Sequence, residues 1–353
     1  MNFTKPALVL DEGRVRRNIE RMAAKADGLG LRFRPHFKTH QSRSIGRIFR
    51  ERGVEAITVS SVDMAAYFAA DGWRDILIAF PLNILELAEI RRLAARVRLG
   101  LLVESTDGLA ALAAGVGRPV DVWIKVDIGA HRAGLDWNDR AALARVCGEV
   151  SRRPKLRLRG LLTHNGRTYA ARTLASLKRA TPTPSARCAW PAGAWRPRDS
   201  RGSEISVGDT PACSRLDDFS GVDEIRPGNF VLHDVTQIEL GSCRERDVAA
   251  AVACPVVAVH ASRREVVVYG GAIHLSKEDF VSESDGRIYG RVSPAARGGL
   301  GTCLEGHGRA EPFSGTRNDR DDSRGDRPGP AGRHPFRPPG PFLSRLSISG
   351  KSM

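Results

Sequence analysis

Residues 56–103 read AITVSSVDMAAYFAADGWRDILIAFPLNILELAEIRRLAARVRLGLLV. The short apolar runs at 56–59, 75–79 and 99–103 predict buried strands, because a parallel strand is covered on both faces. Between the last two runs, residues 84–96 have the apolar spacing of a helix. Strands that alternate with helices in this way predict a parallel sheet with helices packed against it.

The same alternation extends along the chain in both directions. Further strands are predicted at 29–33, 120–126, 156–163, 204–207 and 222–225, and further helices at 109–114 and 138–150. Counted from the first of these strands, the chain contains eight strand–helix units. Eight units favour a closed α/β barrel of the (β/α)8 TIM type over an open doubly wound sheet.

A change of pattern near Gly241 predicts a second domain. The runs at 248–259 and 264–269 have the composition of strands, and no helical segment separates them. The N-terminal run at 7–10 is expected to join these strands. We therefore expect a barrel over residues 12–240 and a smaller, mainly β domain, incomplete at its end, over 1–11 and 241–292.

The net charge of +15 is concentrated in two unusual stretches, residues 172–202 and 291–353, which also hold 12 of the 20 prolines. Nucleic-acid surfaces instead place basic residues on folded elements among aromatic side chains, so we expect no nucleic-acid partner. Proline, glycine and arginine in this proportion are typical of disorder. We predict that residues 172–202 and 293–353 are disordered.

Other global features indicate a cytoplasmic protein. The sequence has no apolar run of about 18 residues that could span a membrane. It also lacks a basic segment followed by an apolar one at its start, which a secretory leader would show. The six cysteines have no close paired spacing, so we interpret them as reduced thiols.

The most unusual motif is Arg34-Pro35-His36-Phe37-Lys38-Thr39-His40, which follows the first predicted barrel strand. A lysine that is desolvated and unprotonated is a nucleophile able to form an imine with an aldehyde. The alternative interpretation is a solvated basic loop. The position of the other motifs favours the first interpretation.

Polar motifs follow four later strands of the predicted barrel, at 125–132, 163–169, 206–211 and 226–229. Active sites of such barrels lie at the carboxyl ends of the strands, so we expect these motifs to gather around Lys38. Small and hydroxyl residues after the seventh and eighth strands suit a phosphate group. A lysine, a phosphate site and arginines between them predict a site for pyridoxal 5'-phosphate.

Six motifs, in this order, resemble those of the D-threonine aldolase and D-serine dehydratase family. These are fold-type III pyridoxal phosphate enzymes, with a barrel related to that of alanine racemase. The motifs are RPHFKTH (34–40), KVDIGAHRAGL (125–135), LLTHNGRTY (161–169), SVGDTPACS (206–214), DEIRPGNFV (223–231) and GGAIHLSKEDF (270–280). The resemblance covers residues 4–170 and 204–291.

The resemblance implies a role for each matching residue. Lys38 would be the Schiff-base lysine and the general base, Arg132 would lie near the phenolic oxygen of the cofactor, and Arg226 would face its pyridine nitrogen. The phosphate would be held by Ser206, Gly208, Thr210, Gly228 and Asn229. The face of the cofactor would be lined by His164, Asn165 and Tyr169.

The family further implies a lyase that acts on a D-3-hydroxy amino acid, as an aldolase or a dehydratase, and works as a homodimer. It also implies a divalent metal, Zn²⁺ or Mn²⁺, with ligands from the C-terminal domain. Those ligands are not recognisable here, because His307 and His334 stand outside any ligand pattern. His274 and Lys277 match the family in that domain; they could lie near the substrate, but we favour the alternative that they are loop contacts.

The two proline-rich stretches depart from the family. Where the chain has residues 172–202, the family has a long amphipathic helix, and from residue 293 it continues its β domain. We interpret both departures as shifts of the reading frame, which could impair the metal site. Two alternatives to a lyase remain at this point: an amino-acid racemase, whose second base could only be Tyr269 or Tyr289, and a pyridoxal phosphate-binding protein without activity.

Overall fold

The computed structural model describes residues 3–181, 204–262, 265–271, 273–275, 279–282, 286–296, 299–301 and 342–346. The chain forms two compact units. One unit comprises residues 13–232 and 237–247, and the other comprises residues 1–12, 233–236 and 248–353.

Eight parallel strands of the described chain form the barrel of the first unit. In the order in which they pair, they are β2 (Arg32–Phe33), β10 (Glu224–Ile225), β9 (Glu204–Gly208), β8 (Leu156–His164), β6 (Val120–Asp127), β5 (Arg98–Val103), β4 (Asp75–Pro81) and β3 (Ala56–Val59). The segment after β2 pairs with β3, since the amide of Phe37 donates to the carbonyl of Thr58 at 2.8 Å. The sheet thereby closes on itself, and the predicted (β/α)8 barrel is confirmed.

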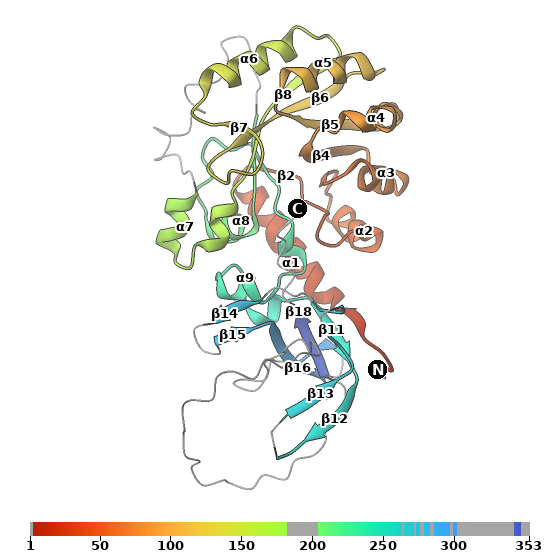
Figure 1. Cartoon of the computed structure of the whole chain (residues 1–353), viewed down its shortest axis with the longest axis vertical. Coiled ribbons are helices and arrows are strands. Elements are labelled where there is room, and N and C mark those ends of the chain that lie inside the picture. The colour runs from red at the N-terminus through yellow and green to blue at the C-terminus, as the bar shows by residue number, and fades with distance from the viewer. Residues whose placement is uncertain are drawn as a thin grey trace, which may run out of the picture. The chain divides into compact units, whose positions relative to one another are not determined.

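Helices α2 to α6 cover the outside of the barrel (Figure 1). In chain order, the helices of the described chain are α1 (Glu12–Gly28), α2 (Arg43–Glu51), α3 (Val62–Ala70), η1 (Ile84–Glu86), α4 (Leu87–Ala94), α5 (Thr106–Gly115), α6 (Arg140–Ser151), η2 (Gly166–Ala170), α7 (Leu174–Ala180), α8 (Thr210–Arg215), η4 (Asn229–Val231), α9 (Val235–Glu239) and η5 (Glu245–Asp247). Serine or aspartate caps several of them: the side chains of Ser42, Ser61, Ser105 and Asp139 each accept a backbone N–H of the first turn. In the part of the chain that the structure describes, no helix is both long enough and apolar enough to cross a membrane.

The interior of the barrel is filled in layers. Leu77, Leu102, Trp123 and Leu162 come from four strands and form one buried cluster. Alternate residues of a strand share a face, so the next inward positions toward the carboxyl end are those of Ala79, Glu104, Lys125 and His164. Three of these four positions are polar, so the apolar layer forms the floor beneath a mainly polar layer.

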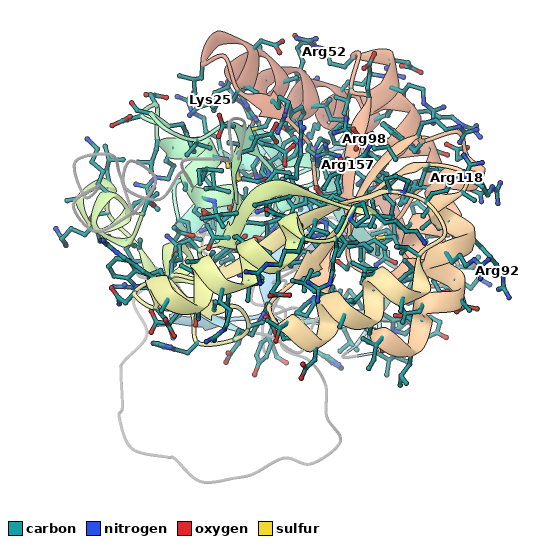
Figure 2. The ribbon with its side chains drawn as sticks, turned by 90° about the horizontal axis from the view of Figure 1, so that it is seen from above. Lys25, Arg52, Arg92, Arg98, Arg118 and Arg157 are labelled. Carbon is teal, nitrogen blue, oxygen red and sulfur yellow. The ribbon has the colours of Figure 1, made fainter. Side chains whose placement is uncertain are left out.

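Ion pairs join the amino ends of seven strands. Arg34 pairs with Asp75 at 2.6 Å and with Glu224 at 2.8 Å. Arg98 and Arg157 lie side by side on the face seen in Figure 2, and both pair with Asp121. The set is completed by Arg98 with Asp75, Arg32 with Glu224 and Glu204, and Arg159 with Glu204. We call these nine side chains the amino-end ion-pair belt.

The second unit is built from β-strands. One sheet has the order β1 (Ala7–Leu10), β11 (Ala250–Cys254), β18 (Phe342–Leu346), β16 (Gly290–Ala296) and β17 (Gly299–Leu300). Two hairpins accompany it, β12 (Val256–His260) with β13 (Glu265–Val268), and β14 (Phe280–Ser282) with β15 (Gly286–Ile288). The predicted strand at 248–259 is thus two strands, which Pro255 separates. A short strand of the first unit, β7 (Leu135–Asp136), pairs with β6.

The prediction of disorder is wrong for parts of both proline-rich stretches. Residues 174–180 form α7, which begins with a capping box between Thr173 and Ser176. In the C-terminal stretch, residues 342–346 form β18, whose backbone pairs with β11 on one side and β16 on the other. Each of these segments is free of proline, so the backbone can complete its hydrogen bonds there. Most of the remainder lies outside the described residues.

Candidate active site

The loop that carries Lys38 is anchored by its neighbours. Phe37 is fully buried, and its ring packs against those of Phe49, Phe68 and Trp73 at centroid distances of 4.9 to 5.2 Å. The amide of His36 donates to the carbonyl of Pro227 at 2.9 Å, which ties the loop to the end of β10. The loop is therefore a fixed part of the barrel and not a solvated basic segment.

The amine of Lys38 is half-buried at the carboxyl end of the barrel. Burial lowers its pKa, and the guanidinium groups of Arg132 and Arg226 lower it further. A lower pKa increases the fraction of unprotonated, nucleophilic amine at neutral pH. Lys38 has the electrostatic properties that a cofactor-binding lysine requires.

The two histidines beside Lys38 differ. The backbone amide of Lys38 donates to Nδ1 of His36 at 3.3 Å, so the neutral ring of His36 carries its proton on Nε2. Burial, and then the charge of Lys38, hold the pKa of His36 well below its usual value. His40 instead packs on the ring of Phe37 at 4.5 Å, and burial lowers its pKa to about 3. His40 belongs to the aromatic cluster that anchors the loop.

His164, which was predicted to line the cofactor, is the last residue of β8. Its Nδ1 lies against the carbonyl of Gly208, which requires the proton to be on Nδ1 and leaves Nε2 as an acceptor. Burial and then the charge of Lys38 lower its pKa to about 3, so the ring is neutral. The ring of Tyr169, also predicted, lies 6.2 Å from it.

Arg226 is held in one position by three hydrogen bonds. Its Nε donates to Oγ of Ser206 at 2.6 Å, and its Nη2 donates to the carbonyl of Thr163 at 2.6 Å and to that of Ser206. The hydroxyl of Ser206 donates in turn to Glu224 at 2.6 Å. Burial lowers the pKa of Arg226 to about 10, which leaves it charged at neutral pH. The Ser206 hydroxyl is already engaged on both sides, so its contact with a phosphate stays a prediction.

The predicted phosphate site contains close backbone approaches and one open hydroxyl. A Cβ on Gly208 would lie 2.8 Å from the carbonyl oxygen of Arg226, and one on Gly228 would lie 3.0 Å from that of His36, so side chains do not fit at either position. Thr210 is fully buried, and its hydroxyl has no hydrogen-bond partner in the described part of the chain. Asn229 follows at the start of η4. A phosphate oxygen would satisfy the Thr210 hydroxyl, so the residues present fit the cofactor.

Arg132 lies on the exposed loop after β6. Asp127 builds this loop, because its carboxylate accepts the backbone N–H groups of Gly129, Ala130 and His131 at 2.8 to 3.2 Å. Gly129 and His131 have positive φ angles of 100° and 51°. The loop is tightly wound and carries Arg132 close enough to influence the pKa of Lys38.

Lys125 is a functional candidate that sequence reasoning missed. Its side chain is 8% exposed, and its amine donates to the carbonyl of Val126 at 3.0 Å. Burial, and then Arg226, lower its pKa to about 8. The sequence did contain a sign of this role. Lys125 begins the motif KVDIGAHRAGL, and the alternation of a strand places it on the same face as Trp123 and Asp127.

Asn165, predicted to line the cofactor, is 4% exposed and uses both ends of its side chain within the protein. Its Nδ2 donates to the carbonyl of Ala180 at 2.6 Å, and its Oδ1 accepts the amide of Arg167 at 3.2 Å. These bonds join η2 to α7. Its contact with a cofactor stays a prediction.

No metal site is visible among the described residues, where no three His, Cys, Asp or Glu side chains come together. His307, His334 and Lys277 lie outside the described part of the chain. His274 is described in the β unit, where its ring lies 6.1 Å from that of Tyr269. The expectation of a divalent metal therefore rests on relatives.

Comparison with known proteins identifies the class. A barrel of this kind, with a lysine after its first strand, is that of the fold-type III pyridoxal phosphate enzymes. Residues 10–234 match the model of the alanine racemase N-terminal domain, and the chain belongs to that family.

The relatives are dehydratases and aldolases. The chain is 34% identical to D-threo-3-hydroxyaspartate dehydratase of Delftia sp. (strain HT23). The match extends over 309 residues and covers 83% of this chain and 80% of that protein. It is 28% identical to D-serine dehydratase of Dictyostelium discoideum, over 78% of this chain and 75% of that one. Enzymes of both names are lyases, and this chain is a pyridoxal phosphate-dependent enzyme of the lyase class.

Solved structures agree with this placement. The Delftia dehydratase superposes with a TM-score of 0.80 at 28% identity, over 98% of this chain and 90% of that one. A cysteine-to-alanine variant of it was solved in the metal-free form and has a TM-score of 0.78. D-threonine aldolase from Filomicrobium marinum, at 20% identity and a TM-score of 0.74, shares the fold.

Proposed function

We propose that this protein is a dehydratase that removes water from a D-3-hydroxy amino acid, with Lys38 as the lysine that carries pyridoxal phosphate. The observation that supports this most is the amine of Lys38, held at the carboxyl end of the barrel with a pKa lowered by burial, Arg132 and Arg226. The lengths of the sequence matches favour dehydration over aldol cleavage. The dehydratase relatives match 74 to 83% of this chain, whereas the aldolase relatives match 46 to 47% of it.

The chain's own residues would hold the cofactor at three points. Thr210, Gly208 and Gly228 would hold its phosphate, Lys38 would hold it covalently, and Arg226 would face its ring. When bound, pyridoxal phosphate supplies an electron sink for the electrons left at Cα of an amino acid. The apolar floor of Leu77, Leu102, Trp123 and Leu162 would exclude water from below.

Proton transfer would fall to Lys38. With its pKa lowered, the free amine can accept the Cα proton at neutral pH. His36 and His164 are neutral and cannot compete for that proton, because burial and the Lys38 charge depress their pKa values. The β-hydroxyl must leave as well. A divalent metal, which the metal-free form of the Delftia variant implies for that enzyme, would supply a Lewis acid for that departure, but the described residues include no group of ligands that would hold it.

The relatives narrow the substrate to two chemistries. By name, they act on D-serine or on D-threo-3-hydroxyaspartate, which differ by one carboxylate on Cβ. We propose that the substrate of this chain is one of these, and that the protein is a cytoplasmic homodimer; light scattering of the purified protein measures the second point.

Absorbance spectroscopy tests the proposal. The protein is loaded with pyridoxal phosphate, and the visible band of the lysine-bound cofactor is compared in the wild type, Lys38→Ala and the control Lys5→Ala, which alters an exposed lysine of the β unit. We expect the band in the wild type and the control only. D-serine, D-threo-3-hydroxyaspartate and D-threonine are then supplied with and without Zn²⁺ or Mn²⁺. Formation of a 2-oxo acid and ammonia supports a dehydratase, whereas an aldehyde or the L-amino acid as product would refute it.

A further inference from the structure

Two loops meet at the carboxyl end of the barrel, the loop 127–134 after β6 and the short helix η2 after β8. A Cβ on Gly129 would lie 3.7 Å from Nη1 of Arg167, and one on Gly166 would lie 3.9 Å from Cβ of Ala130. The guanidinium of Arg167 therefore lies over the turn that leads to Arg132. Arg167 stood in one of the six motifs, but the resemblance gave it no role.

The backbone on both sides of Arg167 is fixed. Asn165 and Thr168 are buried, at 4% and 0% exposure. The hydroxyl of Thr168 lies 2.8 Å from the carbonyl oxygen of Asn165 and 2.9 Å from Oδ1 of Asp209. Arg167 thus extends from a short helix whose neighbouring residues are buried and hydrogen-bonded, so its backbone is held at the carboxyl end of the barrel.

None of the ion pairs found within the described part of the chain involves Arg167. Asp127 is the acid on the facing loop, and its two oxygens are occupied by three backbone amides and by the ring of His131 at 3.6 Å. The arginines at the other end of the barrel are paired, as Arg34 is with Asp75 and Glu224. The charge of Arg167 is accordingly available to an anion that enters the mouth.

We propose that Arg167 binds a second carboxylate of the substrate and so selects acidic D-3-hydroxy amino acids, such as 3-hydroxyaspartate. This inference rests on the proposed function. A planar guanidinium can bind a carboxylate through two parallel hydrogen bonds, which lysine cannot do. A substrate with a single carboxylate, such as D-serine, leaves Arg167 unused, so the residue discriminates between the two substrate chemistries.

Ligand binding without turnover tests the assignment. D-aspartate and D-alanine have no β-hydroxyl and differ in the second carboxylate, and each perturbs the visible band of the lysine-bound cofactor on binding. Their dissociation constants are measured for the wild type, Arg167→Met, Arg167→Lys and the control Arg172→Met, an exposed arginine just beyond η2.

Loss of a charged hydrogen-bond partner weakens binding by roughly tenfold or more. We expect that loss for D-aspartate in Arg167→Met, an intermediate value in Arg167→Lys, and values within about twofold of the wild type for D-alanine in every variant. If the cofactor band persists and Arg167→Met weakens the binding of D-aspartate and D-alanine equally, or weakens the binding of neither, the assignment is overturned. Absence of the band from the wild type would instead refute the proposed function itself.

Discussion

Replacement of Phe37 by alanine should weaken the binding of pyridoxal phosphate more than the accompanying loss of stability alone would explain. The ring of Phe37 is fully buried and contacts the rings of His40, Phe49, Phe68 and Trp73. Replacement of such a ring by a methyl group costs about 3–5 kcal/mol of unfolding free energy. Because the next residue is Lys38, the Phe37→Ala loop also loses its anchor, and we expect the dissociation constant of pyridoxal phosphate to rise at least tenfold.

Phe68→Ala is the matched control. Phe68 is equally buried in the same cluster, but it lies on α3, and the residues next to it in the chain do not belong to the predicted cofactor site. Urea unfolding of the barrel should show similar losses for both variants, and absorbance titration should show weak cofactor binding in Phe37→Ala alone. Equal effects of the two variants on cofactor binding would refute the view that Phe37 acts by positioning Lys38.

Three further predictions concern buried polar groups. Thr210→Val should weaken pyridoxal phosphate binding by roughly tenfold with a change in melting temperature of no more than a few degrees, because it removes a buried hydroxyl that has no partner in the described chain; an unchanged dissociation constant would contradict it. Glu224→Gln should cost about 3–5 kcal/mol in urea unfolding, since it removes a carboxylate that is buried against Arg34; a loss under 1 kcal/mol would show that the pair is dispensable. For Lys125, the folded-state pKa of about 8 lies below the ordinary value of 10.5, so between these pH values the unfolded chain binds more protons than the folded one. The unfolding free energy of the cofactor-free protein should therefore rise with pH in this range, and Lys125→Met should flatten the rise. Identical pH profiles of the wild type and the variant would exclude a lowered pKa of Lys125.

The barrel was predictable from the sequence because its strands are continuous apolar runs. Residues 75–79 and 120–126 face the core on one side and helices on the other, and burial on both faces leaves a plain signal. Strand ends were less predictable. The predicted strand at 222–225 keeps only Glu224 and Ile225, since the amide of Val222 donates to the carbonyl of Phe219 in the preceding turn and not to a neighbouring strand.

The site was predictable only in part, because motifs show which residue types occur and not which partners they choose. Lys38 lies where the strand count placed it. Ser206 and Asn165 were predicted to meet the cofactor, yet their side chains are engaged by Arg226 and Glu224, and by Ala180, at distances along the chain that no local pattern reveals. Lys125 was overlooked because its burial depends on the whole barrel.

The disorder predicted for the proline-rich stretches rested on average composition. Composition does not locate short proline-free segments inside such a stretch. Residues 174–180 have a capping threonine ahead of them, and residues 342–346 have two neighbouring strands to pair with. Local capping and long-range pairing therefore prevail over the composition of the surrounding sequence.

The amino-end ion-pair belt has a consequence for the order of assembly. Arg32 and Arg34 belong to the first barrel segment, whereas Glu204 and Glu224 belong to the last two strands. A chain that has folded only through β8 leaves Arg32 without a carboxylate and Arg34 with Asp75 alone, so part of the charge at this end stays uncompensated. Arrival of β9 and β10 supplies both glutamates at the moment when the cylinder closes. A partial barrel that lacks these two strands therefore lacks the ion pairs that Glu204 and Glu224 make with Arg32 and Arg34.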